Sequence, residues 1–331
     1  MSGCHMTIAM VFPGQGSQSV GMMAGYGNVA RGTFAEASEA LRQDLWRLVT
    51  EGPANELNET LNTQPIMLCA GIAVYREWLQ SGGEIPAVVA GHSLGEYSAL
   101  VAADVFSFPD AVKLVRFRAQ AMSAAVPAGE GAMAAILGLD AEAVEALCAE
   151  AAQDEILQPA NYNSGSQIVI AGQRTAVERA IELAPSWGAD RALILPLEER
   201  RATSRVAKRA LMLPVSGPFH SALMQPAADR LRGYLKSVSV AVPKIAVVHN
   251  ADLKTHDDPA EIKDALVAQV CNPVRWVETV HLIAARQITM LIEAAPGNVL
   301  TGLNKRIMPE LRSLCLTDSS VIRSCLPKKS H

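Results

Sequence analysis

The amino-acid sequence predicts an α/β protein in which helices pack on a mainly parallel sheet, with a small α+β subdomain of ferredoxin-like type. Half of the 331 residues are hydrophobic but only 5% are aromatic, a composition typical of helices packed on a parallel sheet. Short apolar runs that end at glycine or proline alternate with helical patterns. From about Gly131, strands and helices follow one another in shorter units, which indicates the subdomain.

Four short apolar runs predict buried strands of the large domain, at residues 7–12, 86–90, 244–249 and 289–293. Helical patterns cover residues 65–79, 96–104, 110–122, 224–236 and 261–270, and a further helix begins near Val299. We therefore expect a discontinuous large domain of residues 7–128 and 216–317, preceded by a leader of residues 1–6. The polar residues 318–331 are expected to form a frayed tail.

The middle of the chain, residues 129–215, is expected to form the small subdomain. Its predicted strands are residues 132–137, 167–171 and 192–196, and its predicted helices are residues 141–152 and 175–187. A near-repeat, RALILP at 191–196 and RALMLP at 209–214, flanks a strongly charged segment, so either copy could take the position of a strand. For this segment we favour a solvated surface insert over a docking surface for an acidic partner.

Charge, cysteine content and hydropathy exclude several classes of protein. The net charge of −4 and the pI of about 6.0 exclude a global basic field, so we expect neither nucleic acid nor a membrane as partner. The six cysteines show no CxxC pairing and no metal-ligand spacing with histidine, which predicts free thiols in a reducing compartment. No apolar run reaches the roughly 18 residues of a membrane span, and residues 1–6 lack the features of a signal peptide. We expect a cytoplasmic protein.

The segment GHSLG at residues 91–95 fits the G-x-S-x-G nucleophile elbow, between a predicted strand and a predicted helix. A sharp turn exposes the Oγ of Ser93, and the two glycines let the strand and the helix approach closely. The backbone N–H of Leu94 then becomes one donor of an oxyanion hole, at the positive end of the following helix. The alternative is an ordinary turn in which Ser93 caps the helix.

A second oxyanion donor and a general base are needed to complete such a site. The glycine-rich loop 14–18 after the first strand is a candidate for the donor, or else a simple turn. Among the seven histidines, His92 is adjacent to Ser93 but points away, because neighbouring residues diverge on an elbow. His220 lies in a loop between a strand and a helix, where catalytic groups often lie, and a purely structural role is the alternative.

Arg118 brings a positive charge onto the apolar face of a predicted helix. It follows Ala111 by seven residues and Leu114 by four, which places all three on one stripe. An unpaired guanidinium on this face would cost several kcal/mol, so it needs a carboxylate. Either an internal Asp or Glu supplies the carboxylate, or the substrate does, held bidentately by the planar guanidinium.

With these motifs, the chain resembles the malonyl-CoA:acyl-carrier-protein transacylase family from close to its start to about Ile307. The matching stretches are FPGQGSQSVGM, TQPIML, GHSLGEYSALVAA, RFRAQAM, NYNSGSQIVIAG, LPVSGPFHSALMQPAA, CNPVRW and APGNVLTGLNKRI. The resemblance implies an α/β-hydrolase-like large domain with a ferredoxin-like small one. It also implies transfer of a malonyl group from malonyl-CoA to an acyl carrier protein, with no bound cofactor or metal.

The resemblance further implies roles for single residues. Ser93 would be acylated and His220 would be its base, oriented by the backbone carbonyl of Gln269 in place of an Asp. The backbone N–H groups of Gln15 and Leu94 would form the oxyanion hole. The residues implied to bind the substrate or to line its site are Arg118, which would hold the malonyl carboxylate, Gln64, His92, Asn161, Asn163 and Phe219, the last in its malonyl-selective form.

Two segments depart from the pattern of the family. Residues 191–208 look like an insertion, and residues 294–297 (AAPG) replace a more usual glycine-rich or acidic version. Fatty acid biosynthesis is the expected pathway, and a monomer is the expected state. The alternatives are the same chemistry in malonate decarboxylation or polyketide synthesis, a serine ester hydrolase, and a non-catalytic module that docks a carrier protein.

Overall fold

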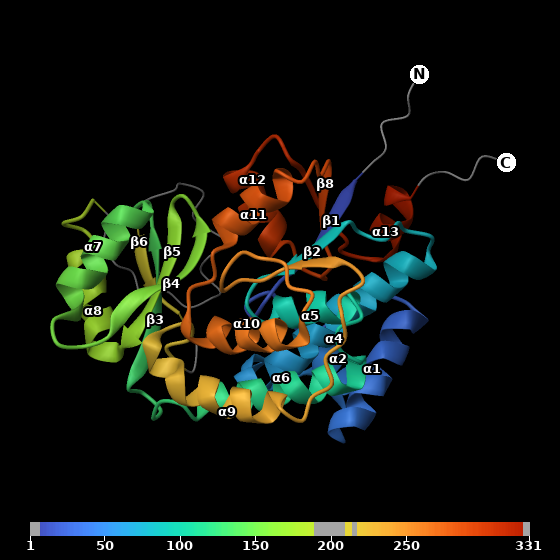
Figure 1. Cartoon of the computed structure of the whole chain (residues 1–331), viewed down its shortest axis with the longest axis horizontal. Coiled ribbons are helices and arrows are strands. Elements are labelled where there is room, and N and C mark those ends of the chain that lie inside the picture. The colour runs from blue at the N-terminus through green and yellow to red at the C-terminus, as the bar shows by residue number, and fades with distance from the viewer. Residues whose placement is uncertain (1–6, 189–208, 214–216, 327–331) are drawn as a thin grey trace.

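The computed structural model of the protein describes residues 7–188, 209–213 and 217–326. The strands are β1 (Ile8–Phe12), β2 (Val88–Gly91), β3 (Gly131–Leu137), β4 (Leu157–Ser164), β5 (Gln167–Gln173), β6 (Arg209–Met212), β7 (Ala246–Val248), β8 (Met290–Glu293) and β9 (Arg312–Cys315). The helices are α1 (Asn28–Leu41), α2 (Leu45–Glu51), α3 (Ala54–Asn58), α4 (Thr60–Gln80), α5 (Gly95–Ala102), α6 (Phe108–Ser123), α7 (Ala141–Ala152), α8 (Arg174–Leu183), α9 (Gln225–Leu235), α10 (Pro259–Cys271), α11 (Trp276–Ala284), α12 (Val299–Ile307) and α13 (Ser319–Cys325). None of these described helices is both long and apolar enough to cross a membrane. The strands form two separate sheets (Figure 1).

The larger sheet has five strands in the order β7-β2-β1-β8-β9, and every neighbouring pair is parallel. β1 lies at its centre, where Met10 pairs with Val89 on one side and with Ile292 on the other. All of β1 is buried, as its apolar run predicts. β9 is not among the predicted strands, because its residues RSLC lie at the sheet edge, are mostly at least partly exposed and carry no apolar pattern.

Helices cover both faces of the parallel sheet. Successive side chains of a strand point to opposite faces, so a strand buried on both sides divides its residues between two cores. Met10 and Phe12 join one core, and Ala9 and Val11 join the other, together with residues of α11 and α12. In Figure 1, α11 and α12 lie on one side of this sheet and α4, α5 and α6 on the other. The predicted α/β class is confirmed.

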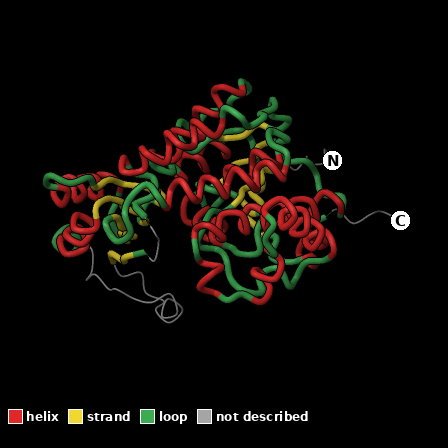
Figure 2. Tube along the Cα trace, turned by 90° about the horizontal axis from the view of Figure 1, so that it is seen from below, coloured by secondary structure: helices red, strands yellow, loops and turns green. Residues whose placement is uncertain are grey.

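The smaller sheet is antiparallel, with the strand order β4-β5-β3-β6. The chain forms it as β3-α7-β4-β5-α8-β6, the ferredoxin-like arrangement that the sequence predicts. Ile168 and Ile170 of β5 pack with α7 and α8, whereas Val169 and Ala171 join a core of the larger sheet. The second face of this sheet is thus buried against the rest of the molecule. Seen from below, the strands of the two sheets form separate groups (Figure 2).

The near-repeat contributes its second copy to the small sheet. β6 begins at Arg209, and Met212 at its end pairs with Ala134 of β3. The predicted strand 192–196, which belongs to the first copy, and the charged segment 191–208 lie outside the described residues. β4 is a further strand that was not predicted, because its sequence LQPANYNS mixes proline and asparagine with few apolar residues.

The prediction of a frayed tail from residue 318 is wrong for the part that the structure describes. Asp318 caps a short helix, α13, because its Oδ1 accepts hydrogen bonds from the N–H groups of Ser320 at 2.7 Å and Val321 at 3.0 Å. Ile322 in this helix is fully buried in the core. The polar composition concealed one capping residue and one buried apolar side chain, which together hold this turn of helix in place.

A direct backbone link joins β4 of the small sheet to the segment that follows α10. The N–H of Tyr162 donates to the carbonyl of Val274 at 2.9 Å, and the N–H of Val274 donates to the carbonyl of Ala160 at 2.8 Å. Asn161 lies between these bonds and forms a parallel bridge with Val274. The asparagine-rich end of β4 is therefore held against the C-terminal end of α10.

Candidate active site

Ser93 lies on a sharp turn between β2 and α5. Its φ of +51° falls in the left-handed region, which a residue with a Cβ adopts at a cost of about 1–2 kcal/mol. A Cβ on Gly91 would lie 1.8 Å from the carbonyl carbon of Gly95, and a Cβ on Gly95 would lie 2.0 Å from the carbonyl oxygen of Phe12. Both positions therefore require glycine. The backbone geometry of the predicted elbow is present, with Ser93 at its apex.

His220 lies against the nucleophile, although the two residues are 127 positions apart in the sequence. Its Nε2 is 2.6 Å from the Oγ of Ser93. Its Nδ1 is 2.9 Å from the backbone carbonyl of Gln269 and 3.2 Å from that of Asn272. Because a carbonyl oxygen can only accept, Nδ1 carries the hydrogen and Nε2 is left as an acceptor for the serine proton. The predicted pair of Ser93 and His220 is thus brought together, with a carbonyl where many such sites have an Asp.

The environment of His220 keeps its imidazole neutral. Burial and, after it, the positive charge of Arg118 lower the pKa of His220 to about 3. A neutral imidazole has its Nε2 lone pair free at physiological pH. The ring is therefore in the form that a general base requires.

Arg118 projects from α6 and is completely buried beside Ser93. Its Nη1 donates to the Oε1 of Gln64 at 2.9 Å, and its Nη2 donates to the Oε1 of Gln269 at 2.9 Å and to the Oγ of Ser93 at 3.2 Å. The guanidinium also lies 5.3 Å from the ring centre of Tyr97. In the described chain it forms no ion pair with an internal carboxylate, so the partners that hold it are neutral.

The loop after β1 packs directly against the elbow. A Cβ on Gly14 would lie 2.6 Å from the carbonyl oxygen of His92, so only glycine allows this approach. The next residue, Gln15, has its side-chain Oε1 3.4 Å from the Nε2 of Gln64. Within the residues that the structure describes, the backbone N–H groups of Gln15 and Leu94 donate to no acceptor. Both are therefore free to donate to a negatively charged oxygen that forms at the serine.

Of four other predicted residues, two lie on β4 of the small sheet and a third contacts it. The Nε2 of His92 is 2.8 Å from the Oδ1 of Asn163, and its ring lies 5.7 Å from that of Trp276. His92 therefore points toward β4, which agrees with its exclusion as the base. The Oδ1 of Asn161 is buried without a partner in the described chain. Phe219 is buried in the core immediately before His220.

Sequence reasoning missed a group of polar residues behind the nucleophile. Glu96, His249 and Asn250 are all completely buried and contact one another. For Gln269 it predicted only the backbone carbonyl, whereas the side chain also contacts Arg118 and Glu96. One signal was present: His249 and Asn250 follow β7, whose carboxyl end lies beside that of β2, where parallel sheets collect functional groups.

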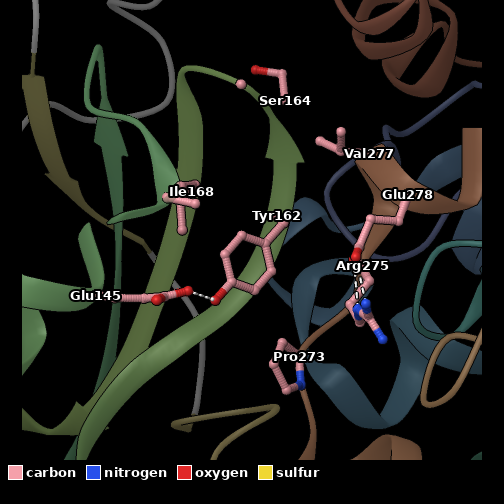
Figure 3. Close-up of a pocket in the computed structure, with 10 residues that line it drawn as sticks. Glu145, Tyr162, Ser164, Ile168, Pro273, Arg275, Val277 and Glu278 are labelled. Carbon is pink, nitrogen blue, oxygen red and sulfur yellow. Dashed lines mark hydrogen bonds and ion pairs between the residues drawn. The ribbon is translucent and has the colours of Figure 1, made fainter. Parts of the chain in front are cut away.

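A cavity of about 470 Å³ lies elsewhere, between the small sheet and the start of α11 (Figure 3). None of the predicted site residues lines it. Its polar side chains contact each other: the hydroxyl of Tyr162 donates to Glu145 at 2.7 Å, and Arg275 pairs with Glu278. A cavity often marks the reacting centre of an enzyme. This one does not, because it lies away from Ser93, where the polar groups are packed against one another.

Comparison with known proteins agrees with this geometry. The model of the acyl transferase domain family matches residues 9–193. The chain is 48% identical over 321 residues to the malonyl CoA-acyl carrier protein transacylase of Salmonella typhimurium, covering 96% of this chain and 98% of that one.

Two solved structures are similar over nearly the whole chain. The acyl-carrier-protein S-malonyltransferase of Burkholderia pseudomallei is 51% identical, with a TM-score of 0.88, and the match covers 96% of this chain and 99% of that one. A malonyl-transacylase solved in complex with a type II PKS acyl-carrier protein is 46% identical, with a TM-score of 0.89, over 97% and 99% of the two chains. On its sequence, its fold and its serine–histidine site, the chain belongs to the malonyl CoA-acyl carrier protein transacylase family of acyl transferases.

Proposed function

We propose that this protein moves a malonyl group from malonyl-CoA to the phosphopantetheine thiol of an acyl carrier protein. The observation that carries the proposal is the position of Arg118, whose Nη2 lies 3.2 Å from the nucleophile oxygen while no carboxylate of the described residues pairs with it. A buried guanidinium without a counter-charge favours a substrate that brings one. The free carboxylate at the far end of a malonyl group supplies that charge beside Ser93.

The first half of the reaction acylates the serine. As the Oγ of Ser93 attacks the thioester carbonyl, the Nε2 of His220 takes its proton. The backbone N–H groups of Gln15 and Leu94 hold the oxyanion that forms. The C–S bond then breaks, His220 returns the proton to the sulfur of coenzyme A, and a malonyl ester remains on Ser93.

The second half runs the same steps in reverse with a different thiol. The phosphopantetheine thiol gives its proton to His220 and attacks the ester carbonyl, and the proton then returns to Ser93 as the ester bond breaks. Each proton transfer uses His220, so the cycle calls for no bound metal or cofactor. During the cycle, Arg118 holds the malonyl carboxylate and thereby fixes the position of the ester carbonyl.

The test is incubation of the protein with malonyl-CoA, followed by intact-mass measurement and by addition of a phosphopantetheine-bearing carrier protein. We expect the protein to gain the mass of one malonyl group and to pass it to the carrier. A docking module would gain no mass, and an ester hydrolase would release malonate faster than it loads the carrier. Either result would reject the proposal. Because the mass gain needs no particular carrier, it holds equally for fatty acid and polyketide systems.

We also predict how acylation depends on pH. The pKa of His220 is lowered to about 3 by burial and by Arg118, so its neutral, proton-accepting form persists far below its ordinary pKa of about 6.5. The kcat/KM for acylation should therefore stay level from about pH 8 to about pH 5 and decline only toward pH 3. Initial rates of malonyl-enzyme formation across this range check the prediction, and an inflection near pH 6.5 would contradict it.

The same pKa shift links stability to pH. The unfolded chain binds a proton at His220 below about pH 6.5, whereas the folded chain does so only near pH 3. Between these values the unfolded state binds more protons at this group. The free energy of unfolding therefore falls as the pH drops from about 6.5 toward 3 and is unaffected by His220 above this range.

For its setting, we propose a cytoplasmic protein that works as a monomer on malonyl-CoA and an acyl carrier protein. The cysteines of the described chain, Cys69, Cys148, Cys271, Cys315 and Cys325, are all free thiols, which suits a reducing compartment.

A further inference from the structure

Glu96 is completely buried near the nucleophile, although the proposed transfer steps do not use it. It lies in the first turn of α5, three residues after Ser93. Its Oε1 is 2.7 Å from the Nδ1 of His249. Its Oε2 accepts hydrogen bonds from the N–H of Asn250 at 3.0 Å and from the Nε2 of Gln269 at 2.7 Å. Burying a carboxylate costs desolvation free energy, which these hydrogen bonds offset. A group buried in this way suggests that the arrangement it holds has a use.

The side-chain amide of Gln269 connects Glu96 to Arg118. Its Nε2 donates to Glu96 and also to the backbone carbonyl of Ser93 at 2.9 Å. Its Oε1 accepts from the Nη2 of Arg118 at 2.9 Å. If the amide were turned over, its oxygen would face a carboxylate and a carbonyl, and its NH₂ would face a guanidinium. All three contacts would then pair like with like, so Glu96 helps to decide which end of the amide Arg118 meets.

This arrangement holds Arg118 without neutralising it. The guanidinium is fixed by two amide oxygens, those of Gln64 and Gln269. An amide oxygen directs a hydrogen bond as well as a carboxylate oxygen does, but it brings no negative charge of its own to the guanidinium. The Nε of Arg118 also has no partner within the described chain. The carboxylate of Glu96 is thus kept one side chain away from a cation that it would otherwise neutralise.

The same carboxylate also supports the elbow through Asn250. The N–H of Asn250 donates to Glu96, while its Oδ1 accepts from the N–H of Ser93 at 2.8 Å and its Nδ2 donates to the carbonyl of Gly91 at 2.7 Å. Glu96 therefore lies at the junction of two arms, one to the nucleophile and one to the guanidinium. The two sets of hydrogen bonds therefore hold Ser93 and the guanidinium of Arg118 in fixed positions relative to each other.

We propose that Glu96 is a positioning residue for substrate selection, which keeps Arg118 aimed at the acyl carboxylate by fixing the side-chain amide of Gln269. This inference rests on the proposed function, because it requires that Arg118 bind the malonyl carboxylate. Its consequence is that the preference for a malonyl over a neutral acyl group depends on Glu96. A carboxylate that only stabilised the first turn of α5 would affect all acyl groups equally.

The test compares Glu96→Met and Glu96→Gln with the wild type. Rates of Ser93 acylation by malonyl-CoA and by acetyl-CoA are followed by intact mass, and their ratio is the readout. We expect Glu96→Met to lower the malonyl preference by about 10- to 100-fold, the loss typical of one hydrogen bond to a charged group. Glu96→Gln should keep most of the preference, because its amide oxygen still accepts from Gln269. An equal fall of both rates in Glu96→Met would overturn the inference.

A second variant tests the same connection between Glu96 and Arg118 by changing Gln269. Gln269→Met removes the amide but keeps the backbone carbonyl that meets His220. It should lower the malonyl preference as Glu96→Met does, and the double variant should be no worse than either single one, because both break the same connection. If Glu96→Met does not fold, Gln269→Met decides alone, and an unchanged preference in it would reject the inference.

The control is Glu77→Gln, which alters another buried carboxylate, on α4, whose side chain meets Ser319. Its malonyl preference should equal that of the wild type. Failure of the inference is distinguishable from failure of the proposed function. If Arg118→Ala abolishes the preference while Glu96→Met and Gln269→Met retain it, the function stands and the role of Glu96 falls. If the wild type shows no preference at all, the proposed function itself is at fault.

Discussion

Ser93→Ala is expected to gain no mass from malonyl-CoA and to lose transfer to the carrier protein by about 10⁴-fold or more. The reason is that the Oγ of Ser93 is the atom that forms the ester, and it is the hydroxyl that the Nε2 of His220 contacts, at 2.6 Å, within the part of the chain that the structure describes. The measurement is intact mass after incubation with malonyl-CoA, together with the rate of carrier loading.

Two comparisons make this result specific. Ser98→Ala changes a buried serine on α5, the helix that follows Ser93, and should load malonyl as the wild type does. Combining Ser93→Ala with His220→Ala should reduce transfer no further than Ser93→Ala alone, because nucleophile and base act as one unit. A malonyl adduct on Ser93→Ala would show that another residue is the nucleophile, and the whole assignment would fail.

The second large effect is expected from Arg118→Ala. This change removes the buried guanidinium that lies 3.2 Å from the nucleophile. Truncating one partner of a buried charge pair costs about 2–5 kcal/mol, so malonyl acylation should fall by about 30- to 4,000-fold. Acylation by acetyl-CoA should fall far less, because a neutral acyl group brings no carboxylate to pair. The ratio of the two rates, from intact mass, is the measurement.

A matched control for this experiment lies on the same helix. Arg116 is two residues earlier on α6, is partly exposed, and hydrogen-bonds the side chain of Gln43 instead of reaching Ser93. Arg116→Ala should leave the malonyl preference unchanged. If Arg118→Ala lowered malonyl and acetyl acylation by the same factor, the guanidinium would have a general structural role, and an ester hydrolase would become the better explanation.

Local sequence patterns predicted much of the fold. Each buried strand of the parallel sheet except β9 appears as a short apolar run, because a strand covered on both faces has apolar residues throughout. The antiparallel subdomain was recognisable from its alternation of short elements, although β4, with its proline and two asparagines, was not. Helix α13 and the edge strand β9 were not predicted, because such elements depend on one or two residues, such as the capping residue Asp318 before α13.

The candidate site shows the same division more sharply. Ser93 and its flanking glycines form a local motif, and Arg118 stands out on an apolar helical stripe, so sequence reasoning reached both. His220 was only one loop histidine among several, since nothing near it in the chain reveals the serine 127 residues away. Glu96 looked like an ordinary helix residue, because its partners His249 and Gln269 are 153 and 173 residues distant.

By itself, the sequence determined most of the helices and strands and the elbow, because dihedral preference, apolar period and the need for glycine act between near neighbours. Only the tertiary structure decided the electrostatics. It placed two amide oxygens against Arg118 and kept the carboxylate of Glu96 one side chain away. Whether a buried charge meets an internal acid or awaits a substrate depends on which distant segments the packing brings within 3 Å. No local pattern carries that information.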